Sequence, residues 1–274
     1  MNELALYAGA GGGLLGSRLL GFRAVCYVEN DPYCVSVLKA RIADGYLDDA
    51  PIWDDARTFD GRPWAGLVDV VTAGFPCQPF SVAGRRKGEE DERNLWPDTI
   101  RIIREVGPRY CLLENVPGLL AHDYFGTILG ELAASGFDAE WGVLSAAAVG
   151  APHLRKRLWI VAYARGAGGR EDARRALGNE ASHGPEDSYI ADGDGEGGGA
   201  RDVADASEQS NGRCRQSRED ARRVSWWAVE PRLGRVAHGV ANRLDRLRAL
   251  GNGQVPAVVA EAWWRLMERC TSGG

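Results

Sequence analysis

Residues 3–13, with the sequence ELALYAGAGGG, decide the fold. A short apolar run of strand type leads directly into four glycines, and a helical pattern begins at Leu14. Glycines let the backbone approach a bulky ligand closely, and the first turn of a helix presents N–H groups without partners. The stretch favours a ligand-binding loop between a strand and a helix, although the glycines alone fit an ordinary tight turn equally well.

A carboxylate follows at the distance that such a loop requires. The second strand pattern ends at Glu29, 18 residues after Gly11, where an acid can accept hydrogen bonds from both hydroxyls of a ribose. Loop and acid together predict a nucleoside-containing cofactor. Asp55, beyond the strand-like Ile52-Trp53, can accept from the exocyclic amine of adenine, and a plain loop acid is an equal alternative.

Strand and helix patterns alternate from residue 1 to residue 164, which predicts an α/β fold. Strand patterns cover residues 3–7, 24–29, 67–72, 109–114, 142–147 and 158–162. Helical patterns cover residues 14–20, 32–42, 96–105, 124–135 and 256–268. Pro32 suits the first turn of its helix, with Asp31 as the cap. Residues 165–225 differ, because 11 glycines and only five large apolar residues cannot bury a core, so we expect loop or disorder there.

The whole chain has 274 residues, of which 45% are hydrophobic, and a net charge of −5. These values fit one large domain, or one domain with a small appendage, and exclude global disorder. No run reaches the roughly 20 apolar residues of a membrane helix, and no basic segment precedes the first apolar run, so we expect a cytoplasmic protein without membrane contact. Six scattered Cys lack disulfide or zinc spacing, which predicts reduced thiols and no metal.

Cys77 follows an apolar strand pattern and lies between Pro76 and Gln78-Pro79. Because prolines on both sides exclude a position in mid-strand, we expect its thiol at the carboxyl end of a strand, where ligands bind in open α/β sheets. A deprotonated thiol is a strong nucleophile. A small buried thiol is the ordinary alternative, and it is our interpretation of Cys26, Cys34, Cys111 and Cys270.

The acidic balance argues against a nucleic-acid partner, but the basic residues are concentrated. Residues 151–165 carry a net charge of +4, and residues 230–256 carry +3. We expect both stretches to line the cleft beside Cys77 as a basic track, so that nucleic-acid binding weakens steeply with salt.

Five motifs occur along the chain in a fixed order: Tyr7-Ala-Gly-Ala-Gly11, Phe75-Pro-Cys-Gln78, Glu114-Asn-Val116, Arg155-Lys-Arg157 and Gly251-Asn252. In this order they resemble the DNA (cytosine-5) methyltransferases, most of all the compact bacterial and phage members. The resemblance covers nearly the whole chain except residues 165–230. It implies a Rossmann-like S-adenosylmethionine-dependent methyltransferase fold with a small, poorly structured target-recognition region. We therefore expect a catalytic and cofactor-binding domain at 1–164, a target-recognition region at 165–230, and a segment at 231–274 that completes the catalytic domain.

The resemblance also implies a covalent mechanism on a cytosine flipped out of double-stranded DNA. Cys77 is then the nucleophile at ring carbon 6, Glu114 is the acid at ring nitrogen 3, and Arg155 and Arg157 contact the target nucleotide. Protonation at nitrogen 3 eases the addition, so burial of Glu114 should raise its pKa. Without the resemblance, Arg155-Lys156-Arg157 is more typical of a solvated basic turn; a period of two would put both arginines on one face.

The remaining site residues are assigned through the same resemblance. Tyr7 stands where the family usually has Phe against the adenine, and Asn252 lies in the last motif, which closes the cofactor site. The expected S-adenosylmethionine-binding residues are Tyr7, Gly9, Gly11, Glu29, Asn30, Asp55 and Asn252, and the expected substrate-binding residues are Pro76, Gln78, Ser81 and Asn115. The chain departs from the family at His153, where Gln is usual, and at Gly253-Gln254, where a small and an aliphatic residue are usual.

Two alternatives stay open. A related branch performs the same chemistry on RNA, and a decayed recognition region would leave a weak DNA-binding or modification-guarding protein. Amino-methylating enzymes are disfavoured, because their Asp/Asn-Pro-Pro-aromatic motif is missing. We further expect a monomer that serves restriction-modification beside a cognate restriction endonuclease.

Overall fold

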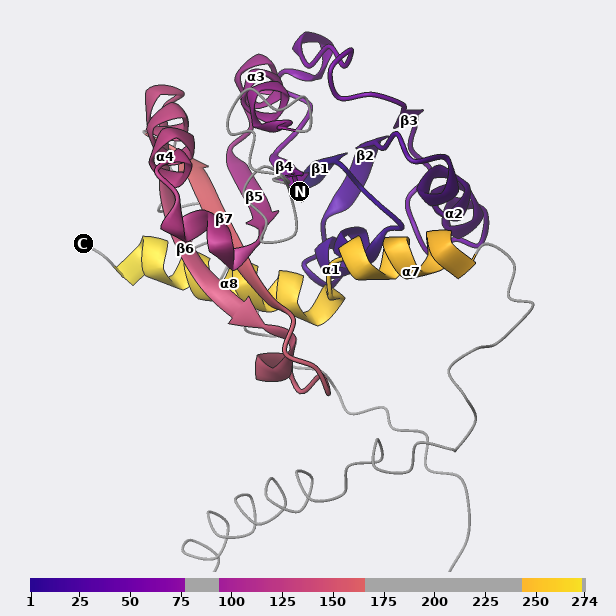
Figure 1. Ribbon diagram of the computed structural model, residues 1–274. Coiled ribbons are helices and arrows are strands. Elements are labelled where there is room, and N and C mark those ends of the chain that lie inside the picture. Colours follow the sequence, from indigo (N-terminus) through magenta and orange to yellow (C-terminus); the bar gives the residue numbers. More distant parts are fainter. Residues whose placement is uncertain (77–93, 166–242, 273–274) are drawn as a thin grey trace, which may run out of the picture. The chain divides into compact units, whose positions relative to one another are not determined.

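The computed structural model describes residues 1–76, 94–165 and 243–272. The described segments up to residue 165 and from residue 244 onward belong to one structural unit. Its centre is a seven-stranded sheet in the order β3-β2-β1-β4-β5-β7-β6, with helices on both faces (Figure 1). The prediction of a layered α/β fold is confirmed. The three-part division at residues 164 and 230 stays a prediction, because residues 166–242 lie outside the described ranges.

The first five strands run parallel, whereas β7 lies between β5 and β6 and is antiparallel to both. The carboxyl ends of the five parallel strands share one edge of the sheet, where ligand sites lie in open α/β folds. The strands are β1 (Asn2–Leu6), β2 (Arg23–Val28), β3 (Ile52–Trp53), β4 (Val70–Ala73), β5 (Tyr110–Asn115), β6 (Phe137–Ser145) and β7 (Lys156–Ala164).

Two groups of helices cover the two faces. α3 and α4 pack on one face through residues such as Ile103 and Ile128. α1, α2 and α8 cover the other, where Trp263 of α8 packs edge-on against Phe22 and Tyr110 at centroid distances of 5.1 and 5.5 Å. The helices are α1 (Gly12–Leu19), α2 (Pro32–Ala43), α3 (Trp96–Val106), α4 (Tyr124–Ala134), α7 (Arg243–Asn252) and α8 (Pro256–Ser272), with short 3-10 turns η1 (Arg62–Trp64), η4 (Pro117–Ala121) and η5 (Ala146–Val149).

Most predicted elements lie within a few residues of the observed ones, with two exceptions. Residues 142–147 were expected to form a strand, but β6 already begins at Phe137 and ends at Ser145. β6 is an edge strand whose residues are mostly exposed or half-buried. Its apolar residues Phe137, Ala139, Trp141 and Val143 alternate with polar residues or glycine, a strand pattern that the predicted start at residue 142 left out. α7 had no prediction, and its Leu244, Leu247 and Leu250 are all more than half exposed, so no buried face supports it.

Local signals at helix ends are confirmed. The Asp31 carboxylate caps α2 by accepting a hydrogen bond from the Cys34 backbone N–H at 3.0 Å, with Pro32 in the first turn. The four cysteines interpreted as buried thiols (Cys26, Cys34, Cys111 and Cys270) are all buried. Within the described ranges, no helix is long and apolar enough to cross a membrane, and no group of three His, Cys, Asp or Glu could hold a metal ion.

Candidate active site

A cavity opens at the carboxyl ends of β1, β4 and β5, beside the glycine loop. It holds about 550 Å³ of empty space, part of which is open to solvent. Its wall combines the backbone of the glycine loop, the ends of these strands and the turn between α7 and α8. Wall residues that matter below are Tyr7, Gly9, Gly12, Gly13, Gly74, Glu114, Trp159, Asn252, Gly253 and Gln254.

The glycine loop has a left-handed backbone at Gly9 (φ 55°) and at Gly11 (φ 87°), the residue before α1. The Gly9 N–H donates to Glu29 Oε2 at 2.7 Å, and the Asp31 N–H donates to Glu29 Oε1 at 2.8 Å. The buried Glu29 carboxylate thus fixes the loop to the end of β2, and each of its oxygens retains a second acceptor position. Sequence reasoning foresaw this acid beside the loop, but not its bonds to the backbone.

Tyr7 connects the glycine loop to α3. Its backbone is also left-handed (φ 56°), and its hydroxyl lies 3.1 Å from both the Leu95 carbonyl oxygen and the Thr99 Oγ1. Burial raises the pKa of this phenol, so the hydroxyl is uncharged at neutral pH. A Phe could pack in the same place, but only Tyr adds this attachment to the first turn of α3.

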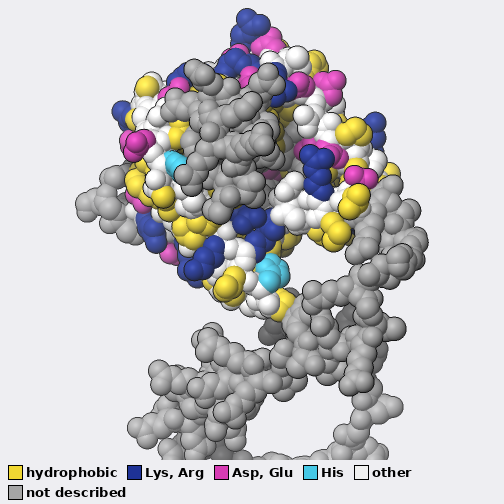
Figure 2. Space-filling view, in the orientation of Figure 1, with side chains coloured by type: hydrophobic (Ala, Val, Ile, Leu, Met, Phe, Trp, Pro, Cys, Tyr) yellow, Lys and Arg dark blue, Asp and Glu magenta, His cyan; other side chains and the backbone are white. Residues whose placement is uncertain are grey.

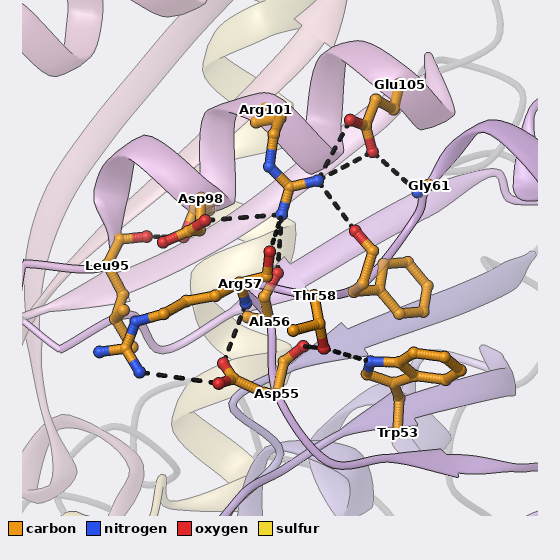
Figure 3. A network of polar contacts seen from close by, with 12 residues as sticks. Trp53, Asp55, Ala56, Arg57, Thr58, Gly61, Leu95, Asp98, Arg101 and Glu105 are labelled. Atoms are coloured by element: carbon orange, nitrogen blue, oxygen red, sulfur yellow. Dashed lines mark hydrogen bonds and ion pairs between the residues drawn. The ribbon is translucent and has the colours of Figure 1, made fainter.

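Asp55 belongs to a loop that Arg101 of α3 holds (Figure 3). The Arg101 guanidinium donates to the carbonyl oxygens of Phe59 at 2.8 Å and Ala56 at 2.7 Å, and it pairs with Glu105 at 3.0 Å. The Asp55 carboxylate accepts from the Arg57 backbone N–H at 2.9 Å. Asp55 does not line the cavity, and Gly11, Glu29 and Asn30 also lie outside its wall.

Glu114 is the charged centre of the cavity wall. It lies on β5 opposite Trp159 of β7, and its side chain is only 12% exposed. The Arg157 Nε donates to Glu114 Oε1 at 2.8 Å, and the Gln254 Nε2 lies 3.4 Å from Glu114 Oε2. Burial raises the pKa of the Glu114 carboxyl, while the charge of Arg157, the amide of Gln254 and the charge of Arg155 oppose the rise. The predicted rise in pKa is confirmed in direction.

Arg155 reaches the same site by a different route from the one expected. It precedes β7 and has a left-handed backbone (φ 27°), so strand alternation does not apply to it, and that part of the prediction is wrong. Its guanidinium donates to the Gly253 carbonyl oxygen. Burial and the charge of Arg157 lower the pKa of Arg155, whereas Glu114 raises it. Both arginines nevertheless act on one carboxylate.

The chain before Cys77 is fixed in the core. Phe75 is buried and packs against Trp96 at a centroid distance of 5.1 Å. The Asn115 Nδ2 donates to the Phe75 carbonyl oxygen at 3.1 Å, from the face of β5 opposite to Glu114. Pro76 is half-buried. The predicted site residues Cys77, Gln78 and Ser81 lie outside the described residues.

A sequence model of the C-5 cytosine-specific DNA methylase family matches residues 1–215. The chain belongs to this family. The resemblance carried by the five ordered motifs is therefore confirmed, and so is the expected Rossmann-like fold of S-adenosylmethionine-dependent methyltransferases.

This methylase is similar to curated type II methyltransferases. M.NgoMIV of Neisseria gonorrhoeae is 38% identical over 164 residues, which cover 59% of this chain and 51% of the relative. M.Eco47II of Escherichia coli is 36% identical over 170 residues, which cover 58% of this chain and 38% of the relative. The chain thus spans about half, or less, of the length of these relatives.

Solved structures share the fold of this methylase. An engineered variant of Spodoptera frugiperda DNMT2 aligns with a TM-score of 0.51 at 24% identity, over 61% of this chain and 50% of that one. A protein described as a DNA modification methyltransferase of an Escherichia coli prophage aligns with a TM-score of 0.50 at 25% identity, over 60% of this chain and 47% of that one.

Three features of the methylase site were not foreseen from the sequence. Trp159 Nε1 is buried in the cavity wall and has no hydrogen-bond partner among the described residues. Glu3 is buried beneath the cavity, where its Oε1 accepts from Ser17 at 2.8 Å and Thr72 at 2.6 Å, and burial raises its pKa to about 7. Gln254 contacts Glu114. The unusual pair Gly253-Gln254 was the only signal for any of them.

Proposed function

We propose that this chain transfers the methyl group of S-adenosylmethionine to carbon 5 of a cytosine flipped out of double-stranded DNA. One observation carries the proposal. The Glu114 side chain, which is 12% exposed and held by Arg157, lies in the wall of the same cavity that the glycine loop borders, and the fixed Phe75 stands two residues before Cys77. A cofactor loop, a buried acid and the approach to a nucleophile thus meet at one edge of the sheet.

The residues of the cavity fit the cofactor. A Cβ added at Gly9 would meet no atom within 4 Å, so this wall is open toward a ligand, and the orphaned Trp159 Nε1 offers a donor in the same wall. Tyr7, Gly9 and Asn252 line the cavity and would contact the ligand, while Glu29 would accept from ribose hydroxyls at its remaining acceptor positions. Gly11 would shape the loop, and Asn30 and Asp55 would close the adenine end. When bound, S-adenosylmethionine supplies an electrophilic methyl group.

The protein's own residues would perform the remaining chemistry. The Cys77 thiolate forms a bond to ring carbon 6, and the neutral Glu114 shares its proton with ring nitrogen 3, so the electron pair of the 5,6 double bond becomes available at carbon 5. Arg157 pairs with the Glu114 carboxyl and keeps it oriented, and the charge of Arg155 acts on the same carboxyl. After methylation, the carbon 5 proton passes to solvent, the Cys77 thiolate leaves carbon 6, and the proton on nitrogen 3 returns to Glu114, which restores the aromatic ring and the free enzyme.

The proposed DNA-contacting residues lie at the end of β5, with Glu114 on one face and Asn115 on the other, and in the segment after β4. Asn115 holds Phe75 and so positions Pro76, and Gln78 and Ser81 follow in the proposed DNA-contacting segment. Figure 2 shows basic side chains low on the face in view and also along its upper rim and sides, where acidic side chains lie among them. A monomeric state, a cytoplasmic location and a cognate restriction endonuclease complete the proposal.

Bisulfite sequencing of plasmid DNA from cells that express this chain tests the activity. We expect protected cytosines within one short sequence context, and none in cells that express Glu114→Gln as a matched control. Soluble protein without any protected cytosine in DNA would refute the proposal. Protection found only in cellular RNA would support the RNA-modifying alternative instead, and specific DNA binding without methylation would support the guarding protein.

A further inference from the structure

We propose that Gln254 is a positioning residue for catalysis, which holds the Glu114 carboxyl against the glycine loop. The inference rests on the proposed function, because Glu114 is the acid of that reaction. It adds a residue that connects the cofactor side of the cavity to the acid.

The Glu114 carboxyl has one side-chain donor on each oxygen. Arg157 Nε lies 2.8 Å from Oε1, and Gln254 Nε2 lies 3.4 Å from Oε2. A separation of 3.4 Å is long for a hydrogen bond, and catalytic hydrogen bonds are often long before substrate binds and shorten in the complex. Two donors from different elements, β7 and the turn before α8, therefore restrict how the carboxyl can turn.

Three glycines enclose Gln254. A Cβ at Gly13 would lie 2.3 Å from Gln254 Oε1, and one at Gly12 would lie 2.5 Å from the Gln254 carbonyl oxygen. A Cβ at Gly74 would lie 2.9 Å from Gln254 Nε2 and 3.1 Å from Glu114 Oε2. Real Cβ atoms essentially never approach other atoms below 3.0 Å, so a side chain at any of these three positions would force Gln254 to shift.

The backbone does not require glycine at these three positions. Gly12, Gly13 and Gly74 are absent from the residues with positive φ, in contrast to Gly9 and Gly11. The missing side chains are instead explained by the close approach of Gln254. The Gln254 amide thus lies between the glycine loop and the end of β4, and its Nε2 is directed at Glu114.

The contact has a definite chemical effect. A donor to the carboxylate form lowers the pKa of an acid, so Gln254 opposes the rise that burial causes at Glu114. Removal of the amide should leave Glu114 with a higher pKa and a less fixed orientation. The maximal rate should fall more than the affinity for DNA.

Gln254→Leu tests the proposal, because Leu keeps much of the volume and removes the donor. We expect a fall of about tenfold in the single-turnover methylation rate, the scale of a hydrogen bond to a charged group, with an unchanged Kd for DNA and a pH profile displaced to higher pH. The carbon-13 NMR titration of the Glu114 carboxyl, made on the protein without ligands, should show the same displacement. Since the NMR titration needs no activity, it separates failure of this inference from failure of the proposed function, in which wild type itself would not methylate.

Gly13→Ala provides a second variant, since its Cβ would lie 2.3 Å from Gln254 Oε1 and displaces the amide without changing Gln254 or approaching Glu114. It should reproduce the pH displacement of Gln254→Leu, whereas Gly130→Ala, on the exposed side of α4 with open space around it, should leave both readouts unchanged. A wild-type pH profile and NMR titration in folded Gln254→Leu, or in folded Gly13→Ala, would overturn the inference.

Discussion

We predict that Gly16→Ala, in α1, destabilises the protein, although the same substitution ordinarily stabilises a helix. In an exposed helix interior, Gly→Ala gains about 1 kcal/mol. A Cβ at Gly16, however, would lie 2.5 Å from Val259 Cβ and 2.7 Å from the Pro256 carbonyl oxygen, both in the first turn of α8. Backbone and Cβ atoms cannot swing aside, so α1 and α8 would have to separate.

Overpacking of this kind costs about 1–3 kcal/mol, so Gly16→Ala should lose up to about 2 kcal/mol of stability after the gain of about 1 kcal/mol from helix propensity is deducted. Gly130→Ala in α4 is the matched control, because its Cβ meets no atom within 4 Å and should stabilise by up to about 1 kcal/mol. The assay is urea unfolding followed by circular dichroism, with the midpoints compared at equal slope. A Gly16→Ala variant at least as stable as wild type would refute the packing argument between α1 and α8.

Four further predictions concern single side chains. Burial raises the pKa of Glu3 from 4.5 to about 7, so folding favours its protonated form. The contribution of Glu3 to the free energy of unfolding should therefore be fully present below pH 4.5, and about 3 kcal/mol of it should be lost as the pH rises through 7. Glu3→Gln should flatten this profile in urea unfolding between pH 5 and 8, and an unchanged profile would contradict the assignment. Cys77→Ser should abolish covalent trapping on DNA that contains 5-fluorocytosine; persistent adducts would move the nucleophile elsewhere. Glu29→Ala removes the acceptor of the Gly9 and Asp31 N–H groups. It should weaken S-adenosylmethionine binding, measured by calorimetry, by at least about tenfold, while the affinity for DNA changes little. Equal losses of both affinities would argue against a cofactor role for Glu29. Arg101→Met removes the hydrogen bonds to the Ala56 and Phe59 carbonyl oxygens, so it should destabilise the chain by about 2 kcal/mol and speed proteolysis within residues 54–61. Protease resistance equal to that of wild type would show that the loop does not depend on Arg101.

The sequence predicted those parts of the site that follow from strand ends. Glu29 and Glu114 both lie at or just beyond the ends of apolar strand patterns, and parallel strands bring such ends to one edge of a sheet. The position of Arg157 followed only from the family resemblance. Its distance to Glu114 depends on the register of β5 with β7, where Glu114 pairs with Trp159, and a sequence pattern does not reveal that register.

The parts that escaped prediction depend on contacts between distant segments. Glu3 resembles an exposed acid near a chain end, and its burial becomes apparent only when Ser17 and Thr72 are brought to it. The glycine run is similar: the sequence shows where glycines occur, but not which ones need a left-handed backbone and which make room for a neighbour. Gly9 and Gly11 belong to the first kind, and Gly12 and Gly13 belong to the second.

Charge shows the same dependence on partners. The basic residues of 151–165 were predicted to line one cleft, but Arg165 pairs with Asp138 at the opposite end of β7 from Arg157, so that prediction is wrong for Arg165. Arg157 pairs with Glu114, and Arg155 donates to the Gly253 carbonyl oxygen.

Arg155 and Arg157 therefore hold other groups of the site in place, which reduces what they can contribute to phosphate contacts. Arg248 likewise pairs with Asp31, at 3.6 Å, although its side chain is 71% exposed. Such an exposed pair is worth little and can exchange for a phosphate, whereas the Glu114–Arg157 pair cannot exchange without loss of the acid's orientation. Salt should therefore weaken DNA binding through exposed residues such as Arg248 and Lys156, and leave the arrangement around Glu114 intact.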